Sequence, residues 1–515
     1  MDTARPPLPA SAGLGPWALG LALGALAVGP ALLAGEAPGH GLTDLWPAIW
    51  AFDEAARAFP GVPTHTLRLA APDGMAVWLA APVKAWVFAP ITAALGAVAS
   101  FTLALGAARA ATVGLAAWAA RGAGCGPAGQ WAFAIAAGAA PFWWGAAWEG
   151  IVEGVDGWAL WLYLGAEARQ RRGWAALALG LCVLCSWYLG AIAVFWLAVL
   201  AVRRPRALGA APGLLLGLPA LAAFLAAFAG VGPAAPGLHA AMGSLHAPPL
   251  PFWLQDAAPV FGRSPWPGLL VLLTGVFGAL HARPAALALA AAAAAAVLST
   301  GLGPWWSLPV LDWMRFPDRL LGAALVGVAA AAASGLDALA ARRPRAAALA
   351  LALLLAEALL LTPQPPVLPR GGAPDRTLTD ALPAGTVLLD LPGPLVFPPG
   401  EPNGSRARAR AVLGAQLGQD LRSPFAFDFN SLAAADGWPG APFGADPLRS
   451  SGGPSISPDL IKDGQNRGIS AVRVRGAELG RRRASALEDA LRESGFREIA
   501  RAGATSLWAW PAAPR

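Results

Sequence analysis

Acidic and aromatic residues stand close together just behind the first long apolar run of the chain. The stretch begins Gly-Leu-Thr-Asp44-Leu-Trp46 and continues as an expected helix in which Trp46, Trp50 and Asp53 share one face. A carboxylate at a membrane surface could remove a proton from a hydroxyl group, so Asp44 is a candidate general base. The competing interpretation is that Thr43 or Asp44 caps the helix.

Asp53 and Glu54 form an adjacent acidic pair on the same expected helix. Neighbouring residues of a helix diverge by ~100°, so we expect the two carboxylates not to face one substrate. At least one of them is then expected on the solvated surface. Both stay candidates for the catalytic carboxylate beside Asp44.

Glu149, Glu153 and Asp156 form a second acidic group further along the chain. Their spacing of i, i+4 and i+7 would line them along one face of a helix. Such a second acidic wall could hold a divalent cation. The alternative is a polar helix end that faces water.

Three arginines are candidates for binding a phosphate group. Arg109 lies in the middle of an apolar run, where a charge costs ~2.5–3.5 kcal/mol on insertion, so we expect it to face a bundle interior and a partner. Arg315 and Arg319 end a loop, and their guanidinium groups match phosphate oxygens. The alternative for these two is interfacial anchoring or pairing with Asp318.

The composition indicates what must position these residues. Hydrophobic residues make up 56% of the 515 residues and charged residues only 13%, with a mean hydropathy of +0.53. This balance excludes an ordinary soluble protein and predicts a polytopic membrane protein. The net charge of +7 comes from arginines at the ends of apolar runs, so we expect topology, and no nucleic acid partner, to explain it.

About eleven apolar runs approach the ~20 residues that a crossing helix needs. The longer runs are 14–35, 96–120, 130–148, 209–230, 319–341 and 346–362. The shorter runs are 157–168, 173–185, 187–202, 267–282 and 284–299. Residues 173–202 are expected to form a hairpin that breaks near Ser186-Trp187.

Arginine clusters mark one end of the predicted crossings, which the positive-inside rule makes cytoplasmic. They comprise Arg121, Arg169, Arg171, Arg172, Arg203, Arg204, Arg206, Arg283, Arg342, Arg343 and Arg345. The N-terminus is then cytoplasmic. Loops 36–95, 149–156, 231–266 and 300–318 face outwards, as does everything after residue 362.

Residues 363–515 have a different composition. They hold half of the 30 Asp and Glu residues, and a proline-rich linker at 363–374 separates them from the last apolar run. Strand patterns cover 386–391, 470–475 and 505–510, and an amphipathic helix pattern covers 485–494. The sequence thus predicts an all-α polytopic membrane bundle at 1–362 and a small soluble α+β domain at 363–515.

Several familiar sites are absent from the sequence. No P-loop, nucleophile elbow or HExxH helix occurs, and no glycine-rich dinucleotide fingerprint follows an expected strand. The five histidines have no ligand spacing, and Cys182 and Cys185 lie inside an apolar run, so we expect neither zinc nor redox chemistry there. No DxD pair is present, which counts against a nucleotide-sugar donor and leaves a lipid-linked substrate open.

With these features placed, residues 14–341 resemble the GT-C class of integral-membrane glycosyltransferases, in particular bacterial members with a C-terminal extracytoplasmic domain. The motifs that carry the resemblance are Gly-Leu-Thr-Asp44-Leu-Trp, Pro72-Asp73-Gly74, Ser186-Trp187-Tyr188 and Met-Arg315-Phe-Pro-Asp-Arg319. The resemblance implies that an acid of the first outer loop activates the acceptor, a role that would fall to Asp44. No second acid adjoins Asp44, so the identity of the base stays open among the acids of this loop.

The resemblance further implies a multi-pass protein of the bacterial inner membrane, surrounded by membrane lipid, with a periplasmic C-terminal domain. We expect it to move a sugar from a polyprenyl-phosphate donor to an extracytoplasmic glycan, lipid or protein acceptor, with Arg315, Arg319 and Arg109 at the phosphate. Two alternatives stay open. One is a non-catalytic envelope scaffold or lipid-binding module, and the other is a transporter, against which the lack of paired broken helices counts.

Overall fold

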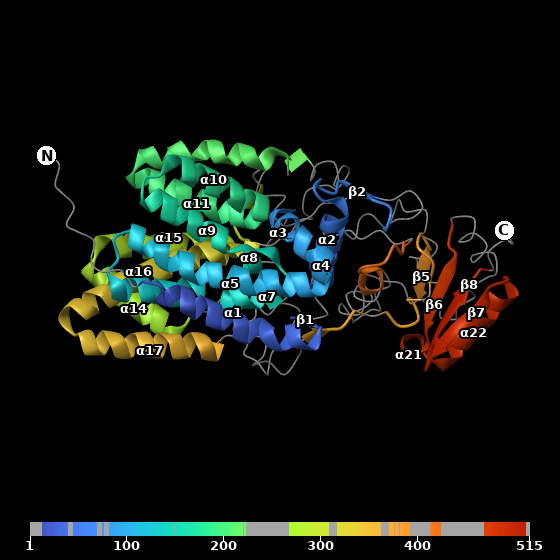
Figure 1. The fold of residues 1–515 in the computed structure, drawn as a ribbon. Coiled ribbons are helices and arrows are strands. Elements are labelled where there is room, and N and C mark those ends of the chain that lie inside the picture. Colours follow the sequence, from blue (N-terminus) through green and yellow to red (C-terminus); the bar gives the residue numbers. More distant parts are fainter. Residues whose placement is uncertain are drawn as a thin grey trace.

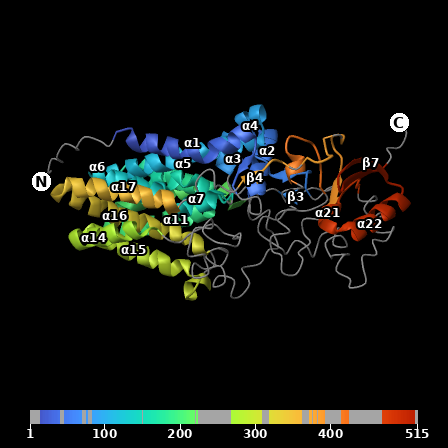
Figure 2. The same cartoon turned by 90° about the horizontal axis from the view of Figure 1, so that it is seen from below.

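The computed structural model describes residues 13–39, 45–69, 75–76, 82–148, 150–219, 221–222, 267–307, 317–361, 370–374, 376–380, 382–391, 413–423 and 468–510. Within them, a long helical bundle occupies one end of the molecule and a small sheet the other (Figure 1). The helices of the bundle run along its long axis, as the second view shows (Figure 2).

The described helices of the bundle are α1 (Gly15–Ala34), α5 (Ala97–Gly122), α6 (Pro127–Phe133), the π-helix η1 (Ala134–Gly138), α7 (Pro141–Trp148), α9 (Trp158–Ala168), α10 (Arg172–Cys185), α11 (Trp187–Arg203), the 3-10 helix η2 (Pro205–Gly217), α14 (Leu269–His281), α15 (Arg283–Ser299), α16 (Leu321–Arg342) and α17 (Pro344–Leu361). Shorter helices connect them: α2 (Leu45–Ala58), α3 (Pro82–Val87), α4 (Ala89–Leu95), α8 (Val152–Asp156), η5 (Pro304–Ser307) and η6 (Pro317–Leu320).

Among the described residues, four helices are long and apolar enough to cross a membrane: residues 15–34, 97–122, 317–342 and 344–361. Four shorter apolar helices, α10, α11, α14 and α15, accompany them. Nine of the eleven predicted runs therefore became helices with nearly the predicted bounds, while the total of eleven crossings stays a prediction. The expected hairpin breaks at Ser186, whose hydroxyl group accepts a hydrogen bond from the Tyr188 amide at 3.1 Å and so begins α11.

Two predicted runs are less regular than expected. Residues 130–148 are divided among α6, η1 and α7, because Pro141 has no amide hydrogen to continue the helix before it. The described start of the 209–230 run belongs to the 3-10 helix η2 rather than to an α-helix.

Two carboxylates on the long helices cap other helices. Asp337 on α16 accepts hydrogen bonds from the amides of Gly126 and Gly129 at the start of α6, both at 2.7 Å. Glu357 on α17 accepts from the Leu269 amide at 2.7 Å at the start of α14. An acid there satisfies exposed amides and the helix dipole, which explains why the apolar helices tolerate it.

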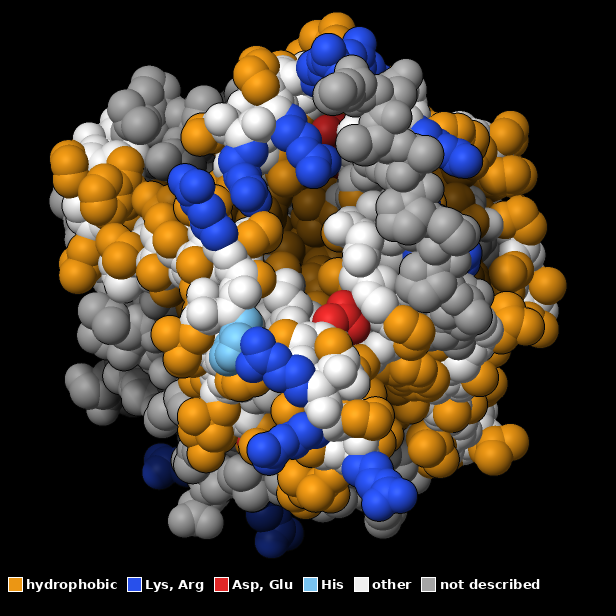
Figure 3. Space-filling model, turned by 90° about the vertical axis from the view of Figure 1, so that its left-hand side faces the viewer, with side chains coloured by type: hydrophobic (Ala, Val, Ile, Leu, Met, Phe, Trp, Pro, Cys, Tyr) orange, Lys and Arg blue, Asp and Glu red, His pale blue; other side chains and the backbone are white. Residues whose placement is uncertain are grey.

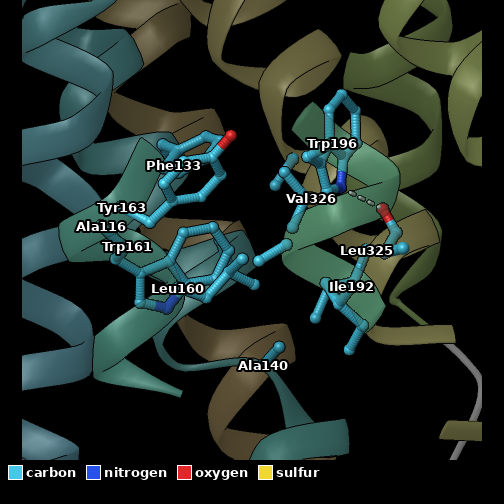
Figure 4. Packing of buried hydrophobic residues seen from close by; sticks show 14 of the residues in the cluster. Ala116, Phe133, Ala140, Leu160, Trp161, Tyr163, Ile192, Trp196, Leu325 and Val326 are labelled. Carbon is cyan, nitrogen blue, oxygen red and sulfur yellow. Dashed lines mark hydrogen bonds between the residues drawn. The ribbon is translucent and has the colours of Figure 1, made fainter. Parts of the chain in front are cut away.

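Small residues bring the helices close together. A Cβ atom added at Gly24 of α1 would lie 2.7 Å from the Gly106 carbonyl oxygen of α5, so the two backbones are nearly in contact. Larger side chains fill the space between other helices (Figure 4). There, the Trp196 indole donates to the Ala323 carbonyl oxygen at 3.2 Å.

The arginine clusters gather at one end of the bundle. Figure 3 views the end that lies away from the sheet, where basic side chains surround a hollow. The clusters predicted to be cytoplasmic are exposed in the structure, except that Arg169 is half-buried. This arrangement agrees with the charge pattern from which the orientation was predicted.

The C-terminal sheet has the order β5-β6-β8-β7, with β5 (Leu388–Leu391) parallel to β6 (Ala471–Arg475) and the other pairs antiparallel. Three strands were predicted, whereas β7 (Arg497–Ala502) was missed. It is an edge strand exposed on both faces, so it lacks the apolar alternation that identifies β5, β6 and β8 (Thr505–Ala509). Helices α21 (Gly476–Leu479) and α22 (Arg481–Glu493) follow β6.

The C-terminal part of the chain is tied to the loop of residues 36–95, which was predicted to face outwards. Within the stretch expected to be a linker, β4 (Arg370–Gly372) pairs with β1 (Ala37–Pro38), which directly follows α1. A short hairpin of β2 (His65–Thr66) and β3 (Met75–Ala76) lies in the same loop. The described part of the expected linker is therefore a strand that joins the two regions, not a free connection.

Candidate functional site

Helix α2 carries several of the residues that the sequence singled out for the candidate site. Its apolar residues recur at helical spacing, and Trp46, Trp50 and Asp53 are all buried, the two indole side chains completely. The shared face was predicted correctly. The tryptophans pack against α5 and against Leu413 and Leu417 of the C-terminal part.

Asp44, the first candidate base, lies outside the described residues, as do Thr43 and the rest of 40–44. The residues on either side are well packed. Leu45 is fully buried, and the backbone of Gly39 has a φ of 135° and leaves only 2.4 Å between an added Cβ atom and the Trp148 carbonyl oxygen. Both ends of the 40–44 stretch thus belong to the core beside Trp148.

Asp53 and Glu54 are both buried, which corrects the expectation that at least one is solvated. Both contact the same guanidinium group: Arg68 Nη1 lies 2.7 Å from Asp53 Oδ2 and also donates to Glu54 Oε1. Two carboxylates that diverge around the helix can still meet one large planar cation placed between them. They are therefore engaged in ion pairs rather than open to a substrate.

The second acidic wall is not one helical stripe. Helix α7 ends at Trp148, Gly150 has a φ of 75°, and Ile151 is extended before α8 begins at Val152. The left-handed glycine breaks the helix on which the i, i+4, i+7 spacing depended. Glu149 and the side chain of Glu153 lie outside what the structure describes.

Asp156, the remaining member, is 1% exposed and does not face water. Its Oδ2 lies 3.5 Å from Lys84 Nζ, and its Oδ1 accepts a hydrogen bond from the Trp158 indole at 3.3 Å. Sequence reasoning missed Lys84 as a site residue. The available signal was its type, since almost all of the 37 basic residues are arginines.

Arg109 is fully buried and faces the bundle interior, as predicted. Its partners are backbone groups and an aromatic ring: the carbonyl oxygens of Gly138 and Gly154 at 3.0 and 3.5 Å, and the Trp144 ring at 4.0 Å. Gly138 ends η1 just before Pro141, so its carbonyl oxygen needs a donor from elsewhere. In this structure the guanidinium group supplies that donor and holds the helix break together.

Arg319 lies on η6, half-buried, with its guanidinium carbon 4.4 Å from the centre of the Tyr188 ring. This contact joins two stretches singled out in the sequence, the Arg319 motif and the Ser186-Trp187-Tyr188 break. Arg315 lies outside the described residues.

Helices α2, α3 and α4 lie at the end of the bundle that faces the sheet (Figure 1). Helix α10 contacts α3 and α8, α11 contacts η6, and α2 contacts α3 and α5. This end thus holds Lys84 on α3 and the start of α2, and the contacts of α10 and α11 link it to Asp156 on α8 and Arg319 on η6. Of these groups, the half-buried Arg319 could bind an anionic group, whereas Asp53, Glu54 and Asp156 are engaged in ion pairs.

A divalent cation finds no ready ligand set among the described side chains. No three His, Cys, Asp or Glu residues gather there as metal ligands would. Asp156 is held by Lys84, and Asp53 and Glu54 by Arg68. The described residues therefore do not fit the expected cation.

No protein-family model matches the chain, and no curated protein matches it. Its fold is similar to that of the arabinofuranosyltransferase AftD from mycobacteria, solved by single-particle cryo-EM, with a TM-score of 0.56 and 17% identity. The match covers 98% of this chain and 40% of AftD, so the chain spans less than half of that protein's length.

The chain also aligns with the oligosaccharyltransferase of Archaeoglobus fulgidus in its apo form. That match has 12% identity and covers 94% of this chain and 72% of the other. Its TM-score of 0.43 is too low to establish a shared fold. AftD is a membrane glycosyltransferase of the GT-C type, and the likeness to it confirms the fold that the sequence motifs suggested. The chain therefore has the GT-C fold of integral-membrane glycosyltransferases.

Proposed function

We propose that this protein is a membrane glycosyltransferase that moves a sugar from a polyprenyl-phosphate donor to an extracytoplasmic acceptor. The acceptor hydroxyl group loses its proton to a carboxylate and attacks the anomeric carbon of the sugar. The bond from that carbon to the phosphate oxygen breaks, and polyprenyl phosphate leaves with the electron pair. The proposed reaction includes no metal-dependent step.

The observation that carries this proposal is the fold shared with AftD over nearly the whole chain. The convergence of charged groups at the outer end of the bundle supports it. That end lies opposite the arginine-rich end, so the positive-inside rule would turn it towards the periplasm.

Asp44 is the proposed base. Asp53 and Glu54 are engaged by Arg68, and Asp156 by Lys84, which makes these three poorer candidates. Arg319, with Arg315 on the same motif, is proposed to bind the donor phosphate. Arg109 is enclosed by its carbonyl partners, so we assign it a supporting role rather than direct contact with phosphate.

The test is a transfer assay of purified protein in lipid nanodiscs with a panel of polyprenyl-phosphate sugars, including an arabinofuranosyl donor. Asp44→Asn keeps the side-chain size and most capping ability, so we expect intact folding but a ~10²–10⁴-fold slower reaction. Asp489→Asn, at an exposed position of α22, is the matched control and should be fully active.

Two results would count against the proposal. Near-normal turnover of Asp44→Asn would show that Asp44 only caps α2 and would return the base role to Asp53, Glu54 or the acidic wall. No transfer by the wild type with any donor or acceptor would favour the non-catalytic scaffold instead.

A further inference from the structure

Among the described residues, a dense group of polar contacts between the bundle and the C-terminal part surrounds Arg68. Besides its ion pairs with Asp53 and Glu54, its Nη2 donates to the carbonyl oxygens of Gln416 and Gln419, the latter at 3.2 Å. The Arg68 carbonyl oxygen accepts from Gln416 Nε2 and from the Ser423 amide, both at 2.7 Å. One buried residue thus binds the end of α2 and residues 413–423 through both its side chain and its backbone.

Neighbouring contacts reinforce this connection. The Trp50 indole donates to Gln416 Oε1 at 2.9 Å, and the Gly418 amide donates to Asp53 Oδ1 at 3.3 Å. Arg57 bridges Asp53 and the Gln419 carbonyl oxygen from the exposed side. Two carboxylates and two guanidinium groups balance in charge, as a buried polar cluster requires.

Residues 413–423 are shaped to join two hydrophobic clusters. Leu413 and Leu417 pack with the first outer loop, whereas Ala415 and Leu421 pack with β5, β6 and β8 of the sheet. The segment therefore connects the sheet to α2 through apolar contacts on both sides and through Arg68 at its centre.

We infer that Arg68 and residues 413–423 form a latch that positions α2, and with it the start of that helix directly after Asp44. Arg68 holds α2 at Asp53, eight residues from Leu45, so it acts through a rigid helix over about 12 Å. Arg68 is thus a positioning residue and not a catalytic one. The catalytic consequence rests on the proposed function, whereas the latch itself does not.

Hydrogen exchange tests the latch without any substrate. In the full chain in nanodiscs, Arg68→Gln should speed exchange at the Gly418 and Ser423 amides about tenfold or more, because both donate into the cluster. Arg57→Gln removes a more exposed partner of the same carboxylate and should change these amides little. Unchanged exchange in Arg68→Gln would overturn the latch.

Arg68→Gln alone leaves buried carboxylates without their cation and could misfold for that reason. A second variant without these charges is therefore needed. Asp53→Asn, Glu54→Gln and Arg68→Gln together remove the ion pairs yet bury no lone charge, and should also speed exchange at these amides. If this folded variant keeps slow exchange, the latch is likewise overturned.

The transfer assay then tests positioning. We expect both variants to lower kcat more than they raise KM for the donor, with partial rescue by Arg68→Lys, which keeps the charge but not the fork. Faster exchange with unchanged kcat would refute the positioning role. If wild-type protein transfers no sugar, the proposed function fails, while the exchange result still decides the latch.

Discussion

The two ends of the membrane bundle carry charge in different ways. At the arginine-rich end, basic side chains lie largely exposed around a hollow (Figure 3). Burial and the neighbouring guanidinium groups of Arg121 and Arg171 lower the pKa of Arg169 there, so like charges are crowded together. At the outer end, Arg68 and Lys84 are buried and lie against carboxylates.

The difference separates two reasons for placing charge in a membrane protein. Exposed arginines at a helix end need no specific partner, and they set orientation through the membrane potential and the positive-inside bias. Buried charges are costly unless paired, so their partners must be placed with them. The buried pairs at the end that faces the sheet are therefore built by the tertiary fold, whereas the exposed arginines at the other end agree with the charge pattern from which the topology was predicted.

The first prediction tests the orientation and has an all-or-none outcome. A periplasmic reporter fused after residue 370 should be active, because that residue follows the last crossing and lies at the end opposite the arginines. A fusion after Arg345, in the basic end, serves as the control and should be inactive. If only a cytoplasmic reporter is active at residue 370, the predicted orientation of the two ends is wrong.

The second prediction concerns the buried pair at the outer end. Lys84→Met removes the ammonium group from beside the buried Asp156 carboxylate and should reduce stability by about 3–5 kcal/mol, measured as the unfolding midpoint in detergent. Adding Asp156→Asn should restore much of this loss because the buried negative charge is removed as well. Equal destabilisation in the single and double variants would show that the contribution of Lys84 to stability does not come from its ion pair with Asp156.

The third prediction compares two arginines on one helix, α5. Arg109→Leu removes the hydrogen-bond donor of the Gly138 and Gly154 carbonyl groups. We expect each lost hydrogen bond to reduce the stability of the fold by about 1–3 kcal/mol. Arg121→Leu, at the exposed end, should change stability by no more than about 0.5 kcal/mol. Similar unfolding midpoints for the two variants would contradict the division between buried and exposed charge.

The smallest effect is expected in the C-terminal sheet. The hydrogen bond from Arg501 lowers the pKa of Glu498. The folded pKa is below the unfolded one, so the pair stabilises the fold above the usual carboxyl range, and this contribution is lost as pH falls through the lowered value. Glu498 is exposed, so Glu498→Gln should cost about 0–1 kcal/mol near pH 7. The difference in melting temperature from wild type should vanish towards pH 3, and a constant difference would exclude the ionised pair as its cause.

Part of this molecule could be predicted from local patterns. Apolar runs predicted α1, α5, α16 and α17 to within a few residues. The reason is that the length and hydropathy of a single segment decide whether it forms a helix that can cross a membrane. Alternation predicted β5, β6 and β8 for the same local reason. The edge strand β7 was not predicted because neither of its faces is covered, so its sequence lacks apolar alternation.

The candidate site was predictable only in part. Residue type and position selected Asp53, Glu54, Asp156, Arg109 and Arg319. All five lie on helices that precede the C-terminal sheet. Their roles depended on partners that spacing does not reveal. The break at Gly150 divided the expected acidic wall, and Lys84, far away in the sequence, neutralised its last member.

The sequence by itself determined that the chain is a membrane bundle with one basic end and a small mixed domain, because composition and periodicity act within single segments. Only the tertiary structure decided which charges meet. Lys84 and Asp156 lie far apart along the chain, and no local pattern relates them. A buried ion pair forms where the fold brings two side chains together out of water, so its existence is a property of the packed whole.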